Sequence, residues 1–420
     1  MSVYEQVTQA LAKAKKLGEK AGLNCIAELD PTAMQQAKEL DARDQTEISD
    51  FWGTPVLIKD NIDVKGLHTT AGSLALDDNI ATEDAPVIRN LRKNGAVILG
   101  KTNMTEFANY TTNGMPGGYS SRGGQVIHAA NPKLSPAGSS SGSAVAVAAG
   151  IVSAAVGTDT SFSIIACAQE NGICGLKPPV GTLSSEGIIP ISKTLDSAGA
   201  MAKNFTDTLR LYSAMREDPL PELQATDSTT LKIAVNTANW NMVSPGQNRF
   251  RRRATRLLKR NGASISKIRQ MPTPFQSVIM KYEFKAHLEE YLCTSSASRK
   301  TLKEIIEYYE SNPEIMMKYG NTLLKAALEE TSGSLQDKEY LAAMEERNKS
   351  IIKVREELAD YDAVIVCGPT NIMHFCGLPS VTIAGSQTNL FGVRRGLILY
   401  GVDEYRLYRA ALAIEKIIGN

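Results

Sequence analysis

The sequence is poor in histidine and tryptophan, and its cysteines follow no motif. Its 420 residues include four histidines, two tryptophans and six scattered cysteines. No CxxC pair is present, so the spacing predicts neither a disulfide framework nor a zinc site, and we expect reduced thiols. No histidine lies in a recognisable nucleophile or metal motif. We therefore expect neither a Ser-His-Asp triad nor a metal or other cofactor.

An excess of charge of one sign is also missing. The chain has 46 basic and 45 acidic residues, so no overall field draws it toward nucleic acid or an anionic membrane. No run is long and apolar enough to span a bilayer, and the amphipathic N-terminal pattern lacks the apolar centre of a signal peptide. These features predict a soluble cytoplasmic protein, monomeric or homodimeric, that binds neither nucleic acid nor membrane.

The order of the expected elements predicts an α/β fold. Helical patterns cover residues 3–21 and 31–41, a short apolar strand covers 55–58, a helix covers 85–94 and a strand follows at 96–99. This βαβ spacing implies parallel pairing of the two strands. A Gly- and Ser-rich stretch from Asn109 to Ser143 predicts a long ordered loop, followed by a small-residue helix to Ala149 and a strand at 151–156.

Residues 217–361 differ in composition from the rest of the chain, because they are richer in charge and are expected to be mostly helical. Apolar spacing there predicts helices at 283–292, 300–310 and 336–358, and we interpret the segment as a covering layer. No internal repeat or linker divides the chain, so we expect one domain over 1–420 with the chemistry in 53–205.

One basic run, Arg249 to Arg260, has two interpretations. It is compatible with a helix that binds nucleic acid or a membrane surface. However, Phe250, Ala254, Leu257 and Leu258 share one face, as in a helix that packs on its own protein and exposes a basic face to solvent. We favour the second interpretation because nothing else in the chain supports nucleic-acid binding.

Two serine-containing segments and an upstream lysine carry the chemistry. They are Pro136-Ala-Gly-Ser-Ser-Ser-Gly-Ser143, Gly157-Thr-Asp-Thr-Ser-Phe-Ser163, and Lys59 at the C-terminal end of the first strand. A Ser/Lys pair can replace Ser/His when the amine is kept neutral, and α/β sheets usually place their chemistry at strand C-terminal ends. Singly, each feature has an ordinary explanation. The serine run could be a turn, the segment 157–163 could be a loop that cradles phosphate, and Lys59 could be a solvated charge. The serine run lacks the Gly-Lys-Ser/Thr of a P-loop.

Together these segments resemble the amidase signature family. The family's two blocks are matched by Ala137 to Gly150 and by Gly157 to Pro178, and the resemblance continues through Gly53-Thr-Pro-Val-Leu-Ile-Lys-Asp-Asn-Ile and Gly100-Lys-Thr-Asn-Met-Thr-Glu-Phe-Ala. It covers residues 20–205 well and the C-terminal portion loosely. Ser184-Ser-Glu-Gly-Ile-Ile-Pro-Ile-Ser and Tyr282-Glu-Phe-Lys are most similar to the bacterial peptide amidase-like branch.

The resemblance implies a single domain with a mixed, mostly parallel central sheet covered by helices. It implies that Ser163 is the nucleophile, that Lys59 is the ultimate base, and that Ser139, typically preceded by the family's cis peptide, bridges the two. Backbone N–H groups of about Thr160 to Ser163, which include Ser161 and Phe162, would hold the oxyanion. Gly138 and Met104 complete the expected substrate-binding set, while Asn103 and Asp159 are expected to support the loops.

The sequence also departs from the family beside the chemistry. Ser161-Phe162 stand where members usually carry Gly-Gly or Asp-Gly, and Ala166-Cys167 replace Cys-Pro. Phenylalanine resists backbone conformations that glycine tolerates, so these changes allow a reshaped acyl pocket, an altered variant or an inactive descendant. We expect an amidase that acts on a peptide C-terminal amide or a small amide. The alternatives are a glutamine-hydrolysing subunit of a tRNA-dependent amidotransferase and a binding protein without catalysis.

Overall fold

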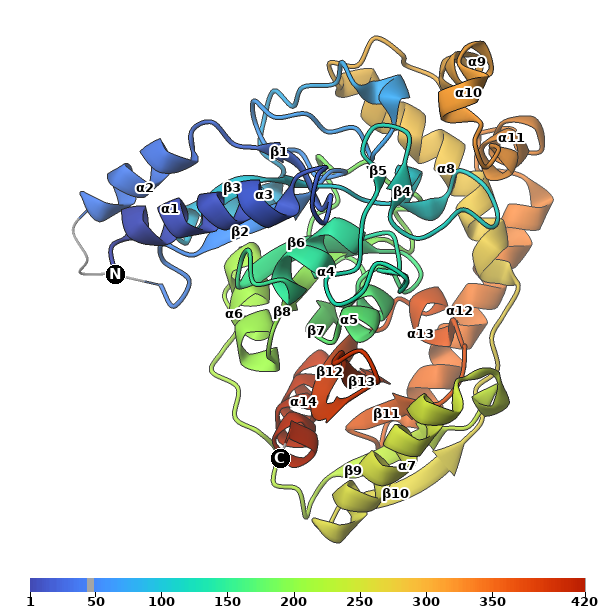
Figure 1. The fold of residues 1–420 in the computed structure, drawn as a ribbon. Helices are drawn as coiled ribbons and strands as arrows, with labels where there is room; N and C mark the ends of the chain where they lie inside the picture. The colour runs from blue at the N-terminus through green and yellow to red at the C-terminus, as the bar shows by residue number, and fades with distance from the viewer. Residues whose placement is uncertain (44–48, 420) are drawn as a thin grey trace.

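A large twisted sheet runs through the computed structural model, which describes residues 1–43 and 49–419 (Figure 1). In the described residues it has eleven strands, which lie in the order β1 (Ile26–Leu29), β3 (Val97–Thr102), β2 (Pro55–Lys59), β6 (Ala154–Asp159), β8 (Ser197–Ala202), β7 (Cys174–Lys177), β12 (Ser380–Thr388), β13 (Arg394–Tyr400), β11 (Ala363–Val366), β9 (Lys232–Asn236) and β10 (Ser264–Ile268). The expected α/β fold and mixed sheet are confirmed.

The expectation of mostly parallel pairing is wrong. Among the ten neighbouring strand pairs of the described sheet, four are parallel and six are antiparallel. The β2–β3 pair is parallel, as its βαβ spacing predicted. In the middle of the sheet, the helix-free segment 178–196 joins β7 to β8, and a short turn joins β12 to β13. Such connections favour antiparallel neighbours because a parallel pair needs a crossover.

Helices cover both faces of this sheet. One face packs against α3 (Pro86–Lys93), α6 (Phe205–Met215), α7 (Pro245–Arg260) and α14 (Glu404–Gly419). The other packs against α1 (Val3–Lys13), α2 (Ala33–Asp41), α4 (Ser141–Ala148), α5 (Ile165–Asn171) and α12 (Lys338–Leu358). Buried apolar side chains alternate between the two resulting cores along β2, where Val56 and Ile58 enter the first and Leu57 the second.

A third core lies at the side of the molecule where α8 to α11 gather (Figure 1). It joins α8 (Phe275–Thr294), α9 (Leu302–Ser311), α10 (Pro313–Met316) and α11 (Thr322–Glu329) to residues that follow β3. Residues 217–361 thus contribute these helices, and they also contribute β9 and β10 to one edge of the sheet. No helix in the described ranges has the length and apolarity needed to cross a membrane.

Short elements complete the chain between the main layers. They are η1 (Ala14–Gly18), η2 (Leu74–Leu76), η3 (Glu106–Asn109), the small hairpin of β4 (Tyr119–Ser120) and β5 (Gly124–Gln125), η4 (Trp240–Met242) and α13 (Ile372–Phe375). The hairpin lies within the predicted long loop between residues 109 and 143. This loop delivers the serine run to the start of α4.

Candidate active site

Lys59 ends the fully buried strand β2 and lies inside the protein. Its Nζ donates hydrogen bonds to the Ser139 Oγ at 2.7 Å, the Thr158 Oγ1 at 2.7 Å and the Thr158 carbonyl at 3.3 Å. The side chain has no exposed surface. The structure therefore brings together Lys59 and Ser139, two of the residues that the sequence singled out.

Burial lowers the pKa of Lys59 to about 7. The charges of Asp159 and Asp196 oppose that shift, but desolvation of the ammonium outweighs them. All three hydrogen-bond acceptors of the amine are neutral oxygens. An appreciable fraction of Lys59 is consequently neutral near pH 7, and a neutral amine can accept a proton.

Side-chain hydrogen bonds hold the serine run in a defined conformation. The Gly138–Ser139 peptide bond is cis, and the side chains that follow bind neighbouring backbone: Ser140 Oγ donates to the Thr158 carbonyl at 3.0 Å and Ser143 Oγ to the Val156 carbonyl at 2.9 Å. These bonds fix the start of α4 against β6. Gly142 permits a close approach of the start of α4 to the chain after β3, because a Cβ there would lie 2.3 Å from the Asn103 carbonyl oxygen.

Ser163 lies on the loop between β6 and α5 and is only 6% exposed. Its carbonyl accepts a hydrogen bond from the backbone N–H of Ser140 at 3.3 Å, which ties the two serine segments together. Asp159 fixes the next turn, since its Oδ2 accepts from the backbone N–H groups of Ile164 at 2.7 Å and Ile165 at 3.2 Å. In the described residues no hydrogen bond joins the Ser163 hydroxyl to Ser139.

Thr160 anchors the first half of the same loop. Its hydroxyl donates to the Asp196 Oδ1 at 2.5 Å, and its carbonyl accepts from the Gln276 Nε2 at 3.2 Å. Burial raises the pKa of Asp196 to about 7. Ser161, the next residue, is only partly buried. The loop is thus held at Thr160 and again after Ser163, with Ser161 and Phe162 between the two anchors.

Phe162 adopts the backbone conformation that a glycine would favour. Its φ is +69°, in the left-handed region, and its ring packs edge-on against His374 with centroids 4.4 Å apart. The His374 Nδ1 lies 3.3 Å from the Asp159 Oδ1 in a fully buried position, and burial lowers the pKa of His374 to about 4. A neutral imidazole therefore supports the ring of Phe162. The positive φ costs free energy in a non-glycine residue, and this aromatic contact offsets part of it.

The remaining sequence-predicted residues surround this centre. Gly138 is packed closely against Thr105, since a Cβ would lie 2.4 Å from the Thr105 Oγ1. Met104 is fully buried in the third core. Asn103 binds the backbone of Asn24 at 3.0 Å through its Nδ2 and accepts from the Gly142 N–H at 2.9 Å, so it links the chain before β1 to α4.

Sequence reasoning missed several polar partners of the site. Asn61 donates to the Thr158 Oγ1 at 3.1 Å, and Thr158 in turn binds Lys59. Both residues lay inside the matched motifs, but a hydroxyl or an amide in a motif does not reveal its partner. Asp196 and His374 lay outside them, and only the fold brings these two beside residues 159–162.

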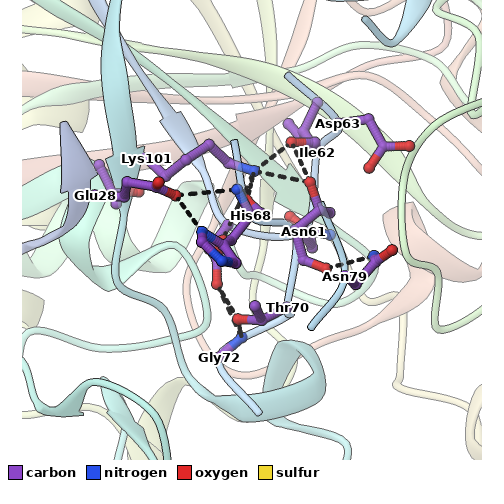
Figure 2. A network of polar contacts seen from close by, with 12 residues as sticks. Glu28, Asn61, Ile62, Asp63, His68, Thr70, Gly72, Asn79 and Lys101 are labelled. Carbon is purple, nitrogen blue, oxygen red and sulfur yellow. Dashed lines mark hydrogen bonds and ion pairs between the residues drawn. The ribbon is translucent and has the colours of Figure 1, made fainter. Parts of the chain in front are cut away.

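A second buried lysine lies next to the site, on β3. Figure 2 shows Lys101 among residues of the loop that follows Lys59. Its ammonium donates to the carbonyls of Ile62 at 2.6 Å and His68 at 2.8 Å. At the rim of this network the His68 Nδ1 lies 3.0 Å from the Glu28 Oε2. The Lys101 network thereby holds the loop that carries Asn61. Among residues 1–43 and 49–419, no group of three or more His, Cys, Asp or Glu could hold a metal ion.

Comparisons with known proteins agree with this architecture. The Amidase family model matches residues 5–382. The chain is 31% identical to a probable amidase of Arabidopsis thaliana, covering 94% of this chain and 83% of the relative, and 28% identical to a glutamyl-tRNA(Gln) amidotransferase subunit of Exiguobacterium sibiricum, covering 100% and 95%. The solved structure of native peptide amidase from Stenotrophomonas maltophilia superposes with a TM-score of 0.89 at 30% identity, covering 100% of this chain and 94% of that one. The chain therefore belongs to the amidase family and is a hydrolase of amide bonds.

Proposed function

We propose that this protein hydrolyses a peptide C-terminal amide or a small carboxylic amide through an acyl-enzyme on Ser163. Lys59 acts as the base and Ser139 passes protons between Lys59 and Ser163. The observation that carries the proposal is the 2.7 Å hydrogen bond between the Lys59 Nζ and the Ser139 Oγ in a fully buried position. Burial lowers the pKa of this amine to about 7, which suits a base that works near neutral pH.

That contact supports the Lys59–Ser139 part of the proton path, and the Ser139–Ser163 part is proposed. Neutral Lys59 accepts the Ser139 proton as Ser139 takes the proton of Ser163, and the Ser163 Oγ forms a bond to the amide carbonyl carbon. The C–N bond then breaks, and Ser139 returns a proton to the departing nitrogen. Water next adds to the acyl carbon and gives a proton to Ser139, which passes its own proton to neutral Lys59. The bond between the acyl carbon and the Ser163 Oγ then breaks, and Ser163 recovers its proton from Ser139 as Lys59 returns one to Ser139, which releases the carboxylic acid.

The proposal assigns the developing negative charge on the carbonyl oxygen to backbone N–H groups of residues 160–163. Two features support this assignment. Thr160 is anchored by Asp196 and Gln276, and Asp159 fixes the backbone directly after Ser163. Donors that are held in place before the reaction need no reorganisation when the charge develops.

The test is ammonia release from a panel of C-terminally amidated peptides and small aliphatic and aromatic amides. Ser163→Ala should remain folded and lose turnover by about 10⁴-fold or more, because the nucleophile is gone. Ser153→Ala is the matched control, since this exposed serine lies ten residues earlier on the same segment and should turn over at the wild-type rate. Turnover by Ser163→Ala comparable to the wild type would overturn the assignment.

A peptide or small amide is favoured as substrate by the comparison with peptide amidase, whose structure covers nearly the whole of both chains. A second function, glutamine hydrolysis within an amidotransferase assembly, is favoured by the full-length similarity to the glutamyl-tRNA(Gln) amidotransferase protein of Exiguobacterium sibiricum. Stable copurification with a second protein, together with ammonia release from glutamine alone among the amides, would select this second function.

The third alternative, a binding protein without catalysis, rested on Phe162. Its left-handed φ argues against that alternative, because the loop keeps a glycine-like path at this position. Binding of an amide by the folded wild-type protein, with no turnover of any amide in the panel, would instead favour it.

A further inference from the structure

A pocket of about 800 Å³ lies between α7 and the edge strands β9 and β10, beside β11. In Figure 1 these elements form the end of the molecule farthest from α1 and α2. Val235 of β9 and Ile265 of β10 contribute apolar lining, and Trp240 of η4 stands at its side. The size is that of a small-molecule site.

Arg251 lines this pocket and is only 6% exposed. Its Nη1 donates to the Val366 carbonyl at 3.1 Å and its Nη2 to the Asn248 Oδ1 at 2.5 Å, while its buried Nε has no partner among the residues that the structure describes. Burial lowers the pKa of this guanidinium, so its charge is desolvated. Both of its acceptors are neutral, and a buried cation is costly unless an anion accompanies it.

Three more cations surround the same pocket: Arg252, Arg256 and Lys267. In the part of the chain that the structure describes, none of these three or Arg251 forms an ion pair with a carboxylate. The Arg252 guanidinium lies 5.6 Å from the ring centroid of Trp240, which is 50% exposed. A flat apolar surface therefore adjoins an unneutralised group of cations.

We propose that this pocket binds a small organic anion in which a carboxylate or phosphate group is joined to a flat apolar body. Arg251 and its neighbouring cations bind the acid group, since a guanidinium presents several N–H donors to carboxylate or phosphate oxygens. The body lies against Trp240 and the apolar strand residues. The proposal is independent of the amidase mechanism, because no residue of this pocket belongs to the Lys59 site.

The expectation of a solvated basic face explains only part of this helix. Phe250, Ala254 and Leu258 are buried, and Arg252 and Arg256 are exposed, as the spacing predicted. Arg251 departs from it because its charge is buried. An arginine placed there only for solubility would extend into water, whereas this one is held by Val366 and Asn248 at the pocket wall.

The test uses the fluorescence of Trp240. The chain has only two tryptophans, and the indole Nε1 of Trp52 has no hydrogen-bond partner within residues 1–43 and 49–419, so Trp52→Phe should fold and leave Trp240 as the single reporter. In that background, the two anionic probes are benzoate and phenyl phosphate, which carry a carboxylate and a phosphate group on the same flat phenyl ring. Benzyl alcohol supplies the body without the acid, and inorganic phosphate the acid without the body.

We expect saturable quenching by benzoate or phenyl phosphate, with binding at least about tenfold tighter than that of either partial probe. The preferred acid then identifies the ligand class. Arg251→Met should raise the Kd by about tenfold or more, while Arg260→Met, on the same helix but outside the pocket, should leave it within about twofold. Lys267→Met, which removes an exposed cation, should raise it by about threefold and covers the case in which Arg251→Met does not fold.

Several results would overturn the proposal. They are no saturable quenching by either anion, equal binding of benzyl alcohol, and equal loss of affinity in Arg260→Met and Lys267→Met. Tighter binding of a single-stranded oligonucleotide than of both small anions would also overturn it, because cations beside an exposed aromatic ring would then serve nucleic acid.

Discussion

Lys59 and Lys101 occupy matching places in the molecule and have different surroundings. Each lies at the C-terminal end of a buried strand, and those strands, β2 and β3, are parallel neighbours. The register pairs Ile58 with Lys101 and Lys59 with Thr102, so the two lysines extend to opposite faces of the sheet. Both are completely buried, and burial lowers the pKa of both.

The partners of the two ammonium groups make the difference. Lys101 donates to two backbone carbonyls and to the Thr69 Oγ1 at 3.1 Å, and the Asp60 Oδ1 lies 3.7 Å away (Figure 2 shows part of this network). Lys59 has no carboxylate within ion-pair distance in the described residues, and its two shortest bonds go to the hydroxyls of Ser139 and Thr158.

This difference separates a lysine that holds a loop in place from the lysine that we propose as the base. A carbonyl oxygen can only accept a hydrogen bond, so an amine surrounded by carbonyls and a carboxylate stays charged and holds a loop in place. Lys101 also contacts the Thr69 hydroxyl, but at 3.1 Å this is its longest hydrogen bond, and Asp60 lies nearby. The two shortest bonds of Lys59 go to hydroxyls, which can give up a proton to a neutral amine. Burial alone therefore does not identify a catalytic lysine.

The largest expected effect is a contrast between the two lysines: loss of Lys59 should impair turnover, and loss of Lys101 should impair stability. Lys59→Met should lower kcat/KM by about 10⁴-fold with stability within about 1 kcal/mol of the wild type, because an apolar side chain replaces a desolvated amine. Lys101→Met should lower the free energy of unfolding by about 3–5 kcal/mol, because Asp60 is left buried without its cation. Amide turnover and urea unfolding of the two variants measure both effects.

The control is the activity that remains in folded Lys101→Met, measured without urea and at low temperature. It should show the wild-type dependence on pH. The proposed distinction between the two lysines would be wrong if Lys59→Met keeps substantial turnover, or if it is the more destabilised of the two variants.

The next effect is the pH dependence of turnover. Lys59 accepts a proton only when neutral, and its pKa is lowered to about 7, so kcat/KM should fall about tenfold per pH unit well below 7 and level off above it. The Thr158 hydroxyl accepts a bond from the ammonium form and stabilises it. Thr158→Val should therefore lower the pKa of Lys59 further and move the midpoint to lower pH.

Thr69→Val is the matched control for that shift. Thr69 offers the same hydroxyl contact to Lys101 on the opposite face, so its loss should leave the midpoint unchanged. An equal displacement in both variants, or a rise of the midpoint in Thr158→Val, would argue that another group controls the profile.

The sequence predicted the positions of these residues better than their surroundings. Strand patterns predicted that Lys59 ends a buried strand parallel to its neighbour, and the resemblance placed Ser139 beside it, where the hydrogen bond now lies. Local periodicity sufficed because each feature depends on a short segment. The surroundings of Lys101 were not predicted, since a lysine in a motif does not reveal whether carbonyls or hydroxyls will surround it.

Features that depend on distant parts of the chain could not be predicted. His374 meets Asp159 and Phe162 only because the C-terminal region folds back onto the loop after β6. The antiparallel middle of the sheet depends on how connections without helices close, for which the sequence has no periodic signal. The burial of Arg251 depends on β11 and its Val366 carbonyl, which is far away along the chain.

The smallest effect concerns packing on the Lys59 face, where Phe162 determines whether the loop of residues 160–163 is as firmly held as the loop around Lys101. Phe162→Ala and Phe162→Gly both lose the ring contact with His374. Only glycine relaxes at a φ of +69°, so Phe162→Gly should be more stable than Phe162→Ala by about 1 kcal/mol. Urea unfolding of the two variants measures this difference, and turnover of Phe162→Gly should stay within about tenfold of the wild type because Lys59, Ser139 and Ser163 are intact. Equal stability of the two variants would mean that residue 162 can leave the left-handed conformation at little cost. The loop on the Lys59 face would then be less firmly held than the loop around Lys101.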